Sequence, residues 1–359
     1  MKSKIIFKAV ASTLMVFAIT FQSCKKQETI TSQEVQTTSK SVEKKTTAFS
    51  LTINNTQDIQ TALNTCEANG GGTVYLRSGW YYIDNTILIP NHCTLRSVAT
   101  ESVPVIRLRD GKDCPIIQNK YIPFSYVNVV RVDIRGGLTD SEMNLPAYFH
   151  KGEQEYNDRI SSGTESKASL DARIDAARLK IYGISFTDNH NSNIRNYNAV
   201  ISDCYVSGCS MGVEIGRTTN VLIKNTKVNN NGAVSKYYHG LYLSSSDKMV
   251  VDGLEAFDNV AIGLKITDFQ DVFTETTNEI KNCNIYNNKW GLKLYHFNGF
   301  NVHHNTVNNN SYSGIELSDC QNGLLTYNTA TGNAVVDIKF ISVSGMTQNN
   351  NTYVTKSGF

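Results

Sequence analysis

The chain has 359 residues, of which 40% are hydrophobic and 18% charged, and its formal net charge is +2. Three of the positive charges lie in the first eight residues, so the rest of the chain has a balance of about −1. A net basic field of the kind that attracts nucleic acid is therefore missing, and we predict no nucleic-acid partner.

The first 23 residues are predicted to be a secretory signal. Three lysines precede the apolar run AVASTLMVFAITF, which is too short and too interrupted by Ser and Thr to span a membrane. The run leads into FQSC, which resembles the cleavage box of bacterial lipoproteins and ends in Cys24. We expect a lipid on Cys24 that anchors the protein to the bacterial outer membrane, on the periplasmic side or at the cell surface. Simple secretion is the alternative.

Residues 24–50 are predicted to be a flexible tether, because Lys, Gln, Glu, Thr and Ser leave almost nothing to bury. The folded domain, residues 51–359, is predicted to open with a short amphipathic helix that ends at the three glycines 70–72. The apolar face of this helix holds Ile59, Ala62, Leu63 and Cys66. Such a helix caps the open end of a stack of strands, which would otherwise pair with another chain.

An insertion is predicted from about residue 138 to 180. This segment lacks the alternation of a strand, and its last part, SKASLDARIDAARLK, has the composition and apolar spacing of a helix. Insertions leave a solenoid through its corners and often wall the binding face. A structural cover over one flank is the alternative.

A repeat of 23 to 29 residues organises the rest of the chain. Phrases such as GLYL, GLKI, GLKL and GIEL begin at equivalent glycines, and Asp337 takes the place of the glycine in the last one. The glycines are Gly183, Gly212, Gly240, Gly263, Gly291 and Gly314. Further strands and clusters of Asn lie between the phrases, and Asn tolerates the left-handed backbone of tight corners. These features predict a solenoid with two or three strands in each coil.

The helix followed by GGGTVYLRSGWYYI and NHCTLRS resembles the N-terminal cap and first coils of pectate-lyase-like right-handed parallel β-helix proteins. The coils from about 181 to 340 are similar to the carbohydrate-binding and sugar-hydrolase repeats of that superfamily. The resemblance implies an all-β right-handed parallel β-helix with an N-terminal capping helix and one partly helical insertion. It does not fix the chemistry, because members include lyases, hydrolases, epimerases and non-catalytic proteins.

One column of side chains is expected to cross the outer face of the glycine-phrase strands. Alternation buries the apolar residues on either side of the middle residue of each phrase, so the middle residue points outward, about 4.8 Å from its neighbour in the next coil. This column consists of Ser185, Glu214, Tyr242, Lys265, Lys293, Glu316 and Lys339. Stacking Lys265 on Lys293 costs stability, and binding an acidic polysaccharide is one reason to tolerate that cost.

The column suggests β-elimination at a uronate, the reaction of a polysaccharide lyase. That reaction requires a cation on the carboxylate, a base for the neighbouring proton and an acid for the leaving oxygen. The predicted catalytic residues are Lys265, Lys293, Tyr242 and His239. The predicted substrate-binding residues are Glu214, Arg217, Asp268, Trp290, Tyr295, His296 and Glu316. Which residue acts as the base remains open among a lysine of lowered pKa, Tyr242 and His239.

Several alternatives compete with this interpretation. The two lysines can be solvated and offset by Glu214 and Glu316. The equivalents of His239 are mostly apolar, so its side chain is expected to turn inward at the corner and pack there. Glu214 with Asp268 could serve a glycoside hydrolase, although the motifs of polygalacturonase-like hydrolases and alginate-type epimerases are missing. A non-catalytic surface glycan-binding protein would need the same groove.

Metal and disulfide chemistry are not expected. No compact carboxylate cluster for Ca²⁺ stands out, so we predict no metal, with Ca²⁺ on the uronate as the alternative. His303 and His304 lack a third ligand in the sequence and are expected to pack at a turn. Seven cysteines remain besides Cys24, and their scatter predicts buried thiols, although export permits a disulfide. We also expect the protein to be a monomer.

Overall fold

The computed structural model describes residues 49–138, 162–163, 166, 168–169, 180–188, 194–232, 238–268 and 278–358. The predicted signal, Cys24, almost all of the tether and almost all of the insertion lie outside these residues. Among the described residues, no helix has the length and apolar character needed to cross a membrane.

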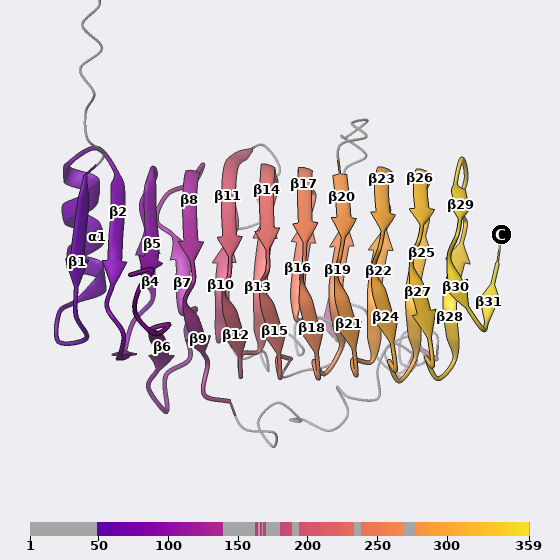
Figure 1. Cartoon of the computed structure of the whole chain (residues 1–359), viewed down its shortest axis with the longest axis horizontal. Coiled ribbons are helices and arrows are strands. Elements are labelled where there is room, and N and C mark those ends of the chain that lie inside the picture. The colour runs from indigo at the N-terminus through magenta and orange to yellow at the C-terminus, as the bar shows by residue number, and fades with distance from the viewer. Residues whose placement is uncertain are drawn as a thin grey trace, which may run out of the picture. The chain divides into compact units, whose positions relative to one another are not determined.

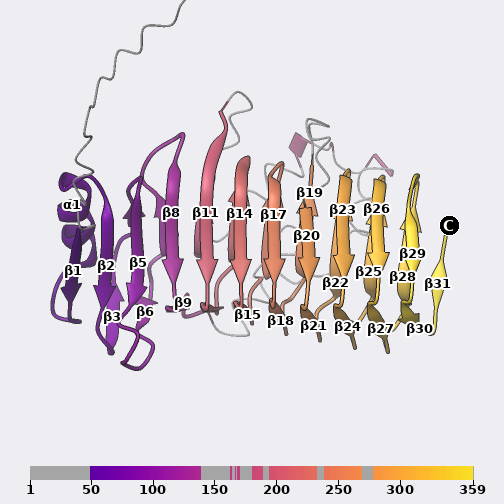
Figure 2. The same cartoon turned by 45° about the horizontal axis from the view of Figure 1, so that its top comes forward.

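Three parallel β-sheets run the length of the domain, and each coil of chain contributes one strand to each sheet (Figures 1 and 2). Sheet A consists of β1 (Ser50–Ile53), β2 (Gly72–Leu76), β5 (Cys93–Ser97), β8 (Ser125–Val130), β11 (Asn196–Ser202), β14 (Thr218–Lys224), β17 (Asp247–Asp252), β20 (Asn278–Lys281), β23 (Asn298–His303), β26 (Gln321–Thr326) and β29 (Thr347–Asn349). Sheet B consists of β3 (Trp80–Ile83), β6 (Val105–Leu108), β9 (Asp133–Arg135), β12 (Tyr205–Ser207), β15 (Lys227–Asn229), β18 (Glu255–Phe257), β21 (Asn284–Tyr286), β24 (Thr306–Asn308), β27 (Thr329–Thr331) and β30 (Thr352–Tyr353).

Sheet C carries the glycine phrases. It consists of β4 (Ile87–Ile89), β7 (Ile117–Asn119), β10 (Tyr182–Phe186), β13 (Met211–Gly216), β16 (Leu241–Ser244), β19 (Ile262–Thr267), β22 (Trp290–Tyr295), β25 (Ser313–Ser318), β28 (Val336–Ile341) and β31 (Lys356–Ser357). The predicted solenoid is confirmed, and the number of strands in each complete coil is three.

Helix α1 (Ile59–Ala68) covers the N-terminal end of the stack, as predicted. Asp58 caps the helix, because its carboxylate accepts a hydrogen bond of 2.6 Å from the backbone N–H of Thr61. The buried helix residues are the four that the sequence placed on the apolar face: Ile59, Ala62, Leu63 and Cys66. The helix therefore shields the first coil from pairing with another strand.

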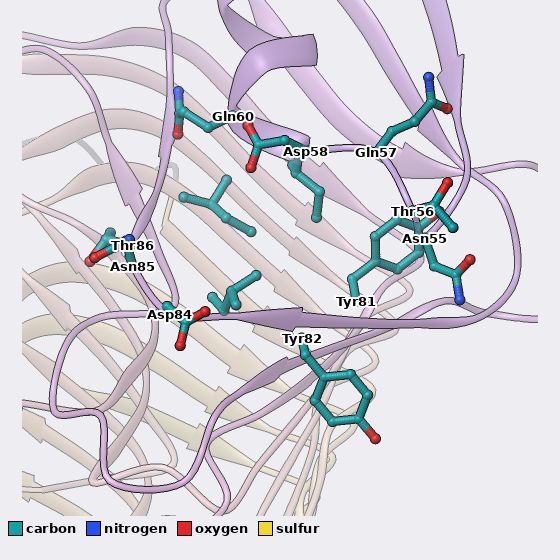
Figure 3. Close-up of a pocket in the computed structure, with 13 residues that line it drawn as sticks. Asn55, Thr56, Gln57, Asp58, Gln60, Tyr81, Tyr82, Asp84, Asn85 and Thr86 are labelled. Carbon is teal, nitrogen blue, oxygen red and sulfur yellow. The ribbon is translucent and has the colours of Figure 1, made fainter.

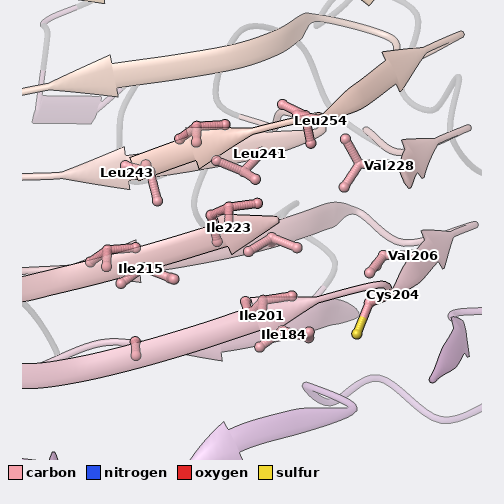
Figure 4. Close-up of a cluster of buried hydrophobic side chains, with 14 of the residues drawn as sticks. Ile184, Ile201, Cys204, Val206, Ile215, Ile223, Val228, Leu241, Leu243 and Leu254 are labelled. Carbon is pink, nitrogen blue, oxygen red and sulfur yellow. The ribbon is translucent and has the colours of Figure 1, made fainter. Parts of the chain in front are cut away.

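Stacked aliphatic side chains fill the inside of the coils, and Figure 4 shows part of this core around Ile184, Ile215 and Leu243. Both apolar positions of each glycine phrase are buried, as the alternation predicted. Each aliphatic residue rests on its equivalents in the neighbouring coils, so the core is continuous along the stack.

A buried ladder of asparagines lies at the corner between sheets B and C. Each side-chain amide donates to the Oδ1 atom of the next coil over 2.9 to 3.2 Å, and the backbone N–H of the same residue donates to that oxygen as well. The ladder contains Asn231, Asn259, Asn288, Asn310 and Asn333. The Asn clusters of the sequence thus do more than permit turns, because they satisfy buried backbone groups across coils.

The ladder explains why each phrase begins with a glycine. A Cβ atom on Gly291 would lie 2.4 Å from Cγ1 of Val307 and 2.8 Å from Nδ2 of Asn310, so the glycine faces inward against the ladder. Asp337 replaces the glycine where the ladder ends. Its Oδ1 accepts 2.9 Å from Nδ2 of Asn333, and its Oδ2 accepts from the backbone N–H groups of Val354 and Thr355. Asp337 therefore closes the ladder, because its Oδ1 accepts the bond that the Asn of a further coil would accept.

Candidate functional site

The outer column of sheet C has the predicted register. The strand pairings place Ser185 beside Glu214, Tyr242 beside Lys265, and Lys293 beside Glu316, with each pair adjoining the next. Residues more than 150 positions apart in the chain thus lie in one row on the outer face of sheet C.

The expectation that His239 turns inward at the corner is wrong. The adjacent glycine makes the inward turn, so the residue before each glycine lies on the outer face with the column. Two contacts on this face confirm the arrangement. The rings of His239 and Tyr242 meet edge to face, with centroids 5.6 Å apart, and Oγ of Ser313 donates to Glu316 over 3.3 Å. His239 is nevertheless buried, with 1% of its surface exposed, as expected of a packed histidine.

Tyr242 is the centre of the candidate site. Its ring has His239 on one side, and the ammonium of Lys265 lies 5.1 Å from its centroid on the side of the next coil. Burial raises the pKa of Tyr242 to about 12, and the negative charge of Glu214 adds to the shift. The phenol is therefore protonated at neutral pH and available as a proton donor.

Lys293 forms an ion pair on the outer face of sheet C, so its positive charge is balanced. Its Nζ lies 2.8 Å from Oε1 of Glu316, whose side chain is only 4% exposed, and Nζ of Lys339 lies 3.6 Å from the other oxygen. The stacking of Lys265 on Lys293 is real, but the carboxylate of Glu316 relieves the repulsion. Of the two predicted lysines, Lys265 is the one beside the tyrosine.

Acidic and aromatic groups continue the face to either side. Arg217 forms a 3.0 Å ion pair with the buried Asp188, and Asp268 is buried as well. The rings of Tyr295 and His296 meet with centroids 4.5 Å apart, at the end of the strand that carries Lys293. Arg217, Asp268, Tyr295 and His296 belong to the predicted substrate-binding set. Tyr295 lies in sheet C, whereas the other three follow the ends of its strands at the corner toward sheet A.

Trp290 belongs to a small apolar cluster with Ala261, Ile262 and Tyr312, separate from the main core. Its ring lies 5.4 Å from that of Tyr312, and the ammonium of Lys339 lies 5.7 Å from the Tyr312 ring. The sequence interpretation missed Tyr312. Its position two residues before Gly314 could have indicated it, because the residues that precede each glycine lie on the outer face of the coil.

The cysteines are thiols, as expected. All seven described cysteines are free, and six of them are buried. Burial raises the pKa of Cys204, Cys209, Cys283 and Cys320 to about 12, so these thiols are inert at neutral pH. No group of three metal-binding side chains is found in the part of the chain that the structure describes.

A cavity of about 470 Å³ lies at the N-terminal end, between the segments 55–60 and 81–87 (Figure 3). Its lining includes Ile59 and Ile83 as well as Asp58, Asp84 and Asn85. None of the predicted site residues lines this cavity. Ser185, Glu214 and Glu316 of the outer column are buried, whereas Tyr242, Lys265 and Lys293 are partly exposed.

The match to a family model agrees with this geometry, because residues 171–335 match the right handed beta helix region. The chain is a right-handed parallel β-helix protein. A search of curated proteins finds no match to its sequence.

Three solved structures illustrate the range of proteins that share this fold. The A-module of the mannuronan C-5 epimerase AlgE4 from Azotobacter vinelandii is 14% identical, with a TM-score of 0.54 over 84% of this chain and 92% of that one. The DFA-IIIase of Arthrobacter chlorophenolicus A6 is 12% identical, with a TM-score of 0.54 over 84% of this β-helix chain and 88% of the other. The Dettilon tailspike protein is 13% identical, with a TM-score of 0.55 over 84% of this chain and 62% of its own. At these identities the likeness establishes the fold alone.

Proposed function

We propose that this β-helix protein is a polysaccharide lyase that cleaves an acidic, uronate-containing glycan by β-elimination on the outer face of sheet C. The observation that carries the proposal is the position of Tyr242 between the His239 ring and the Lys265 ammonium. One face thus holds a proton donor, an imidazole and a cation in contact. The reaction needs these three kinds of group together.

Each of the three residues has one role in the proposed reaction. The ammonium of Lys265 binds the uronate carboxylate and makes the proton on the neighbouring carbon more acidic. We assign removal of that proton to His239, which requires its buried ring to become accessible when the glycan binds; a carbon–carbon double bond then forms, and the bond to the glycosidic oxygen breaks. The phenol of Tyr242, kept protonated by its raised pKa, gives its proton to the leaving oxygen. Return of the proton from the imidazolium of His239 to the phenolate of Tyr242, through solvent, restores both groups.

Glu316 and Lys293 support the site from the next coils. Their 2.8 Å ion pair keeps two charges on the face without a net charge, so Lys265 supplies the positive charge nearest to Tyr242. The rings of Trp290 and Tyr295 offer flat surfaces to neighbouring sugar units. Glu214 offers a polar group in the same row, and Arg217, Asp268 and His296 offer polar groups at the corner where the sheet C strands end.

Uronate C-5 epimerisation is the second candidate. Its first step is the same removal of a proton beside a carboxylate, and the A-module of a mannuronan C-5 epimerase shares the fold over 84% of this chain. The two reactions differ in their second step, because the epimerase returns a proton to the opposite face of the carbon and leaves the glycan chain intact.

Incubating residues 50–359 with pectate, alginate and glycosaminoglycans in D₂O separates the functions. A lyase produces an unsaturated uronate, detected by its ultraviolet absorbance. An epimerase incorporates deuterium at C5 without shortening the chain. New reducing ends without ultraviolet absorbance would indicate a hydrolase, and binding without any product would indicate a non-catalytic glycan-binding protein; either result contradicts the proposal.

The Tyr242→Phe variant tests the proton donor. Removing the hydroxyl is expected to lower turnover by about 10²- to 10⁴-fold, because that is the usual contribution of a positioned acid. Tyr197→Phe is the matched control, since Tyr197 is an exposed tyrosine of sheet A. Equal activity of the two variants would move the site elsewhere.

We also propose that the protein is an exported monomer held to the outer membrane by a lipid on Cys24, and that it needs no metal. Replacing Cys24 by Ser is expected to move the protein from the membrane fraction to the soluble fraction. Activity that is lost in a chelator and restored by Ca²⁺ would instead give the carboxylate-neutralising role to the ion.

A further inference from the structure

A histidine pair lies at the end of β23, on the corner between sheets A and B. The Nδ1 atoms of His303 and His304 are 2.8 Å apart, and the two rings are nearly perpendicular. On the other side of the first ring, Nε2 of His303 lies 2.9 Å from Oε1 of Glu279 in β20. His304 is exposed, so the pair can be reached from solvent.

The hydrogen-bond partners decide where the protons are. An ionised carboxylate only accepts, so Nε2 of His303 carries the hydrogen that it shares with Glu279. In the neutral ring, Nδ1 of His303 then carries a lone pair, which accepts in the contact with Nδ1 of His304. The hydrogen between the two Nδ1 atoms therefore belongs to His304. This arrangement of carboxylate, imidazole and open nitrogen is the one that orients metal-ligating histidines in proteins.

We propose that a divalent transition-metal ion of the Cu²⁺ or Ni²⁺ kind binds the two Nδ1 atoms, while the hydrogen on Nδ1 of His304 moves through solvent to Nε2 of the same ring. Metal–imidazole bonds of about 2.0–2.1 Å at a right angle place the two nitrogens about 2.9 Å apart, and a tetrahedral angle places them about 3.3 Å apart. The observed 2.8 Å matches the right angle. Square-planar and octahedral geometries are typical of Cu²⁺ and Ni²⁺, whereas Zn²⁺ prefers a tetrahedron.

The backbone at His304 turns at the corner of the coil. Its φ is +56°, and the register makes it equivalent to seven other corner residues with positive φ. Five of the seven are Asp, Asn or Gly, the residues that tolerate this conformation best: Asp203, Asn225, Gly253, Asn282 and Asn350. Arg131 and Tyr327 occupy the other two positions, and His304 adopts the same left-handed backbone.

Tyr327, the equivalent residue of the next coil, fixes the orientation of the second ligand. Its ring stacks on that of His304 at 11° with centroids 5.1 Å apart. The remaining positions around the ion would be taken by water, because no third His, Cys, Asp or Glu converges with the pair among the residues with described positions. The site lies on a different sheet from the candidate lyase site, so neither proposal depends on the other.

Titrating the full chain with Cu²⁺, Ni²⁺ and Zn²⁺ separately tests the proposal, with calorimetry for all three ions and electron paramagnetic resonance for Cu²⁺. One Cu²⁺ ion is expected to bind with two nitrogen ligands, and Ni²⁺ is expected to bind more tightly than Zn²⁺. Absence of stoichiometric Cu²⁺ binding, or tighter binding of Zn²⁺ than of Ni²⁺, would overturn it.

Three variants complete the test. His304→Asn is expected to abolish this binding while it keeps the corner folded, because Asn fills the same corner in three other coils. Glu279→Gln is expected to weaken it by about 10- to 100-fold, the usual effect of losing a carboxylate behind a ligating histidine. His92→Ala is the matched control and is expected to change nothing, since His92 also has a positive φ and stacks on a tyrosine, Tyr126. Unchanged Cu²⁺ binding by His304→Asn would contradict the site.

Discussion

The asparagine ladder and the outer column of sheet C run along the same stack of coils, but they differ in how much the residue type varies from coil to coil. In the ladder one residue type recurs from Asn231 to Asn333, and every member makes the same bonds. In the outer column the residue changes from Glu214 to Tyr242 to Lys265. Both columns have strict register, so register alone does not decide which residue stands at a position.

The difference lies in what each position requires. A buried ladder needs a short side chain that donates to one neighbour and accepts from the other, and the amide of Asn does both. The outer face demands only that polar groups be paired or reach water, which several residue types can do. Repetition along a column therefore marks a structural requirement, and variation marks a position that is available for chemistry.

The largest loss of stability is expected when the ladder is cut in the middle. Asn288→Ala removes the acceptor of the backbone N–H and side-chain amide of Asn259. Buried groups left unpaired cost about 1–3 kcal/mol each, so we expect a loss of about 2–5 kcal/mol in the free energy of unfolding. Denaturant unfolding followed by circular dichroism measures it. A loss below about 1 kcal/mol would mean that water replaces the amide and that the ladder is dispensable.

A smaller loss is expected at an inward glycine. The new methyl group of Gly291→Ala would lie 2.4 Å from Val307, so neighbouring groups must move, at a cost of about 1–3 kcal/mol. Gly216→Ala is the matched control on the outer face, where the closest atom is Oγ of Ser244 at 3.3 Å, and it is expected to stay within about 0.5 kcal/mol. Equal thermal unfolding midpoints for the two variants would contradict the assignment of inward and outward glycines.

The end of the ladder is expected to respond to acid. Burial raises the pKa of Asp337, but the hydrogen bonds from Asn333, Thr355 and Val354 outweigh it, so the pKa lies below its usual value. Because the folded-state pKa is the lower one, this carboxylate stabilises the fold fully above the unfolded pKa of about 4, and the contribution is lost as the pH falls through the folded pKa. Asp337→Asn is expected to be less stable at pH 7 and to lose part of the difference in stability between pH 7 and pH 3. An unchanged difference would show that Asp337 does not titrate with folding.

The smallest effect on stability is expected in the outer column. Tyr242→Phe removes one hydroxyl from a residue that is not part of the core, and a single hydrogen bond contributes about 1 kcal/mol or less. Its turnover is expected to fall sharply in the same preparation. If Tyr242→Phe lost several kcal/mol of stability and kept its activity, the outer column would be a structural feature like the ladder.

Much of the fold was predictable from the sequence because each coil repeats a short pattern. The spacing of the glycine phrases predicted the solenoid, the alternation predicted the buried positions, and the face of α1 was predicted residue by residue. The vertical pairing of Tyr242 with Lys265 was also predictable, since equivalent residues of successive coils occupy the same position in adjacent parallel strands.

The side-chain contacts were less predictable. The orientation of His239 was misjudged because its apolar equivalents suggested the core, whereas the inward turn belongs to the glycine beside it. Residue type alone did not predict the ion pair of Lys293 with Glu316 or the contact between His303 and His304. Charges one coil apart can pair or repel, depending on side-chain conformations that the sequence does not specify.

By itself, the sequence determined the repeat, the strands and the columns, because the periodicity of apolar residues reflects burial that every coil shares. Only the tertiary structure decided which side chains touch. His239 contacts Tyr242, Glu316 lies between Lys293 and Lys339, and the Nδ1 atoms of the two histidines at the end of β23 meet at the corner. These contacts join different coils or depend on a turned backbone, and their energies come from distances of a few ångströms that no local pattern encodes.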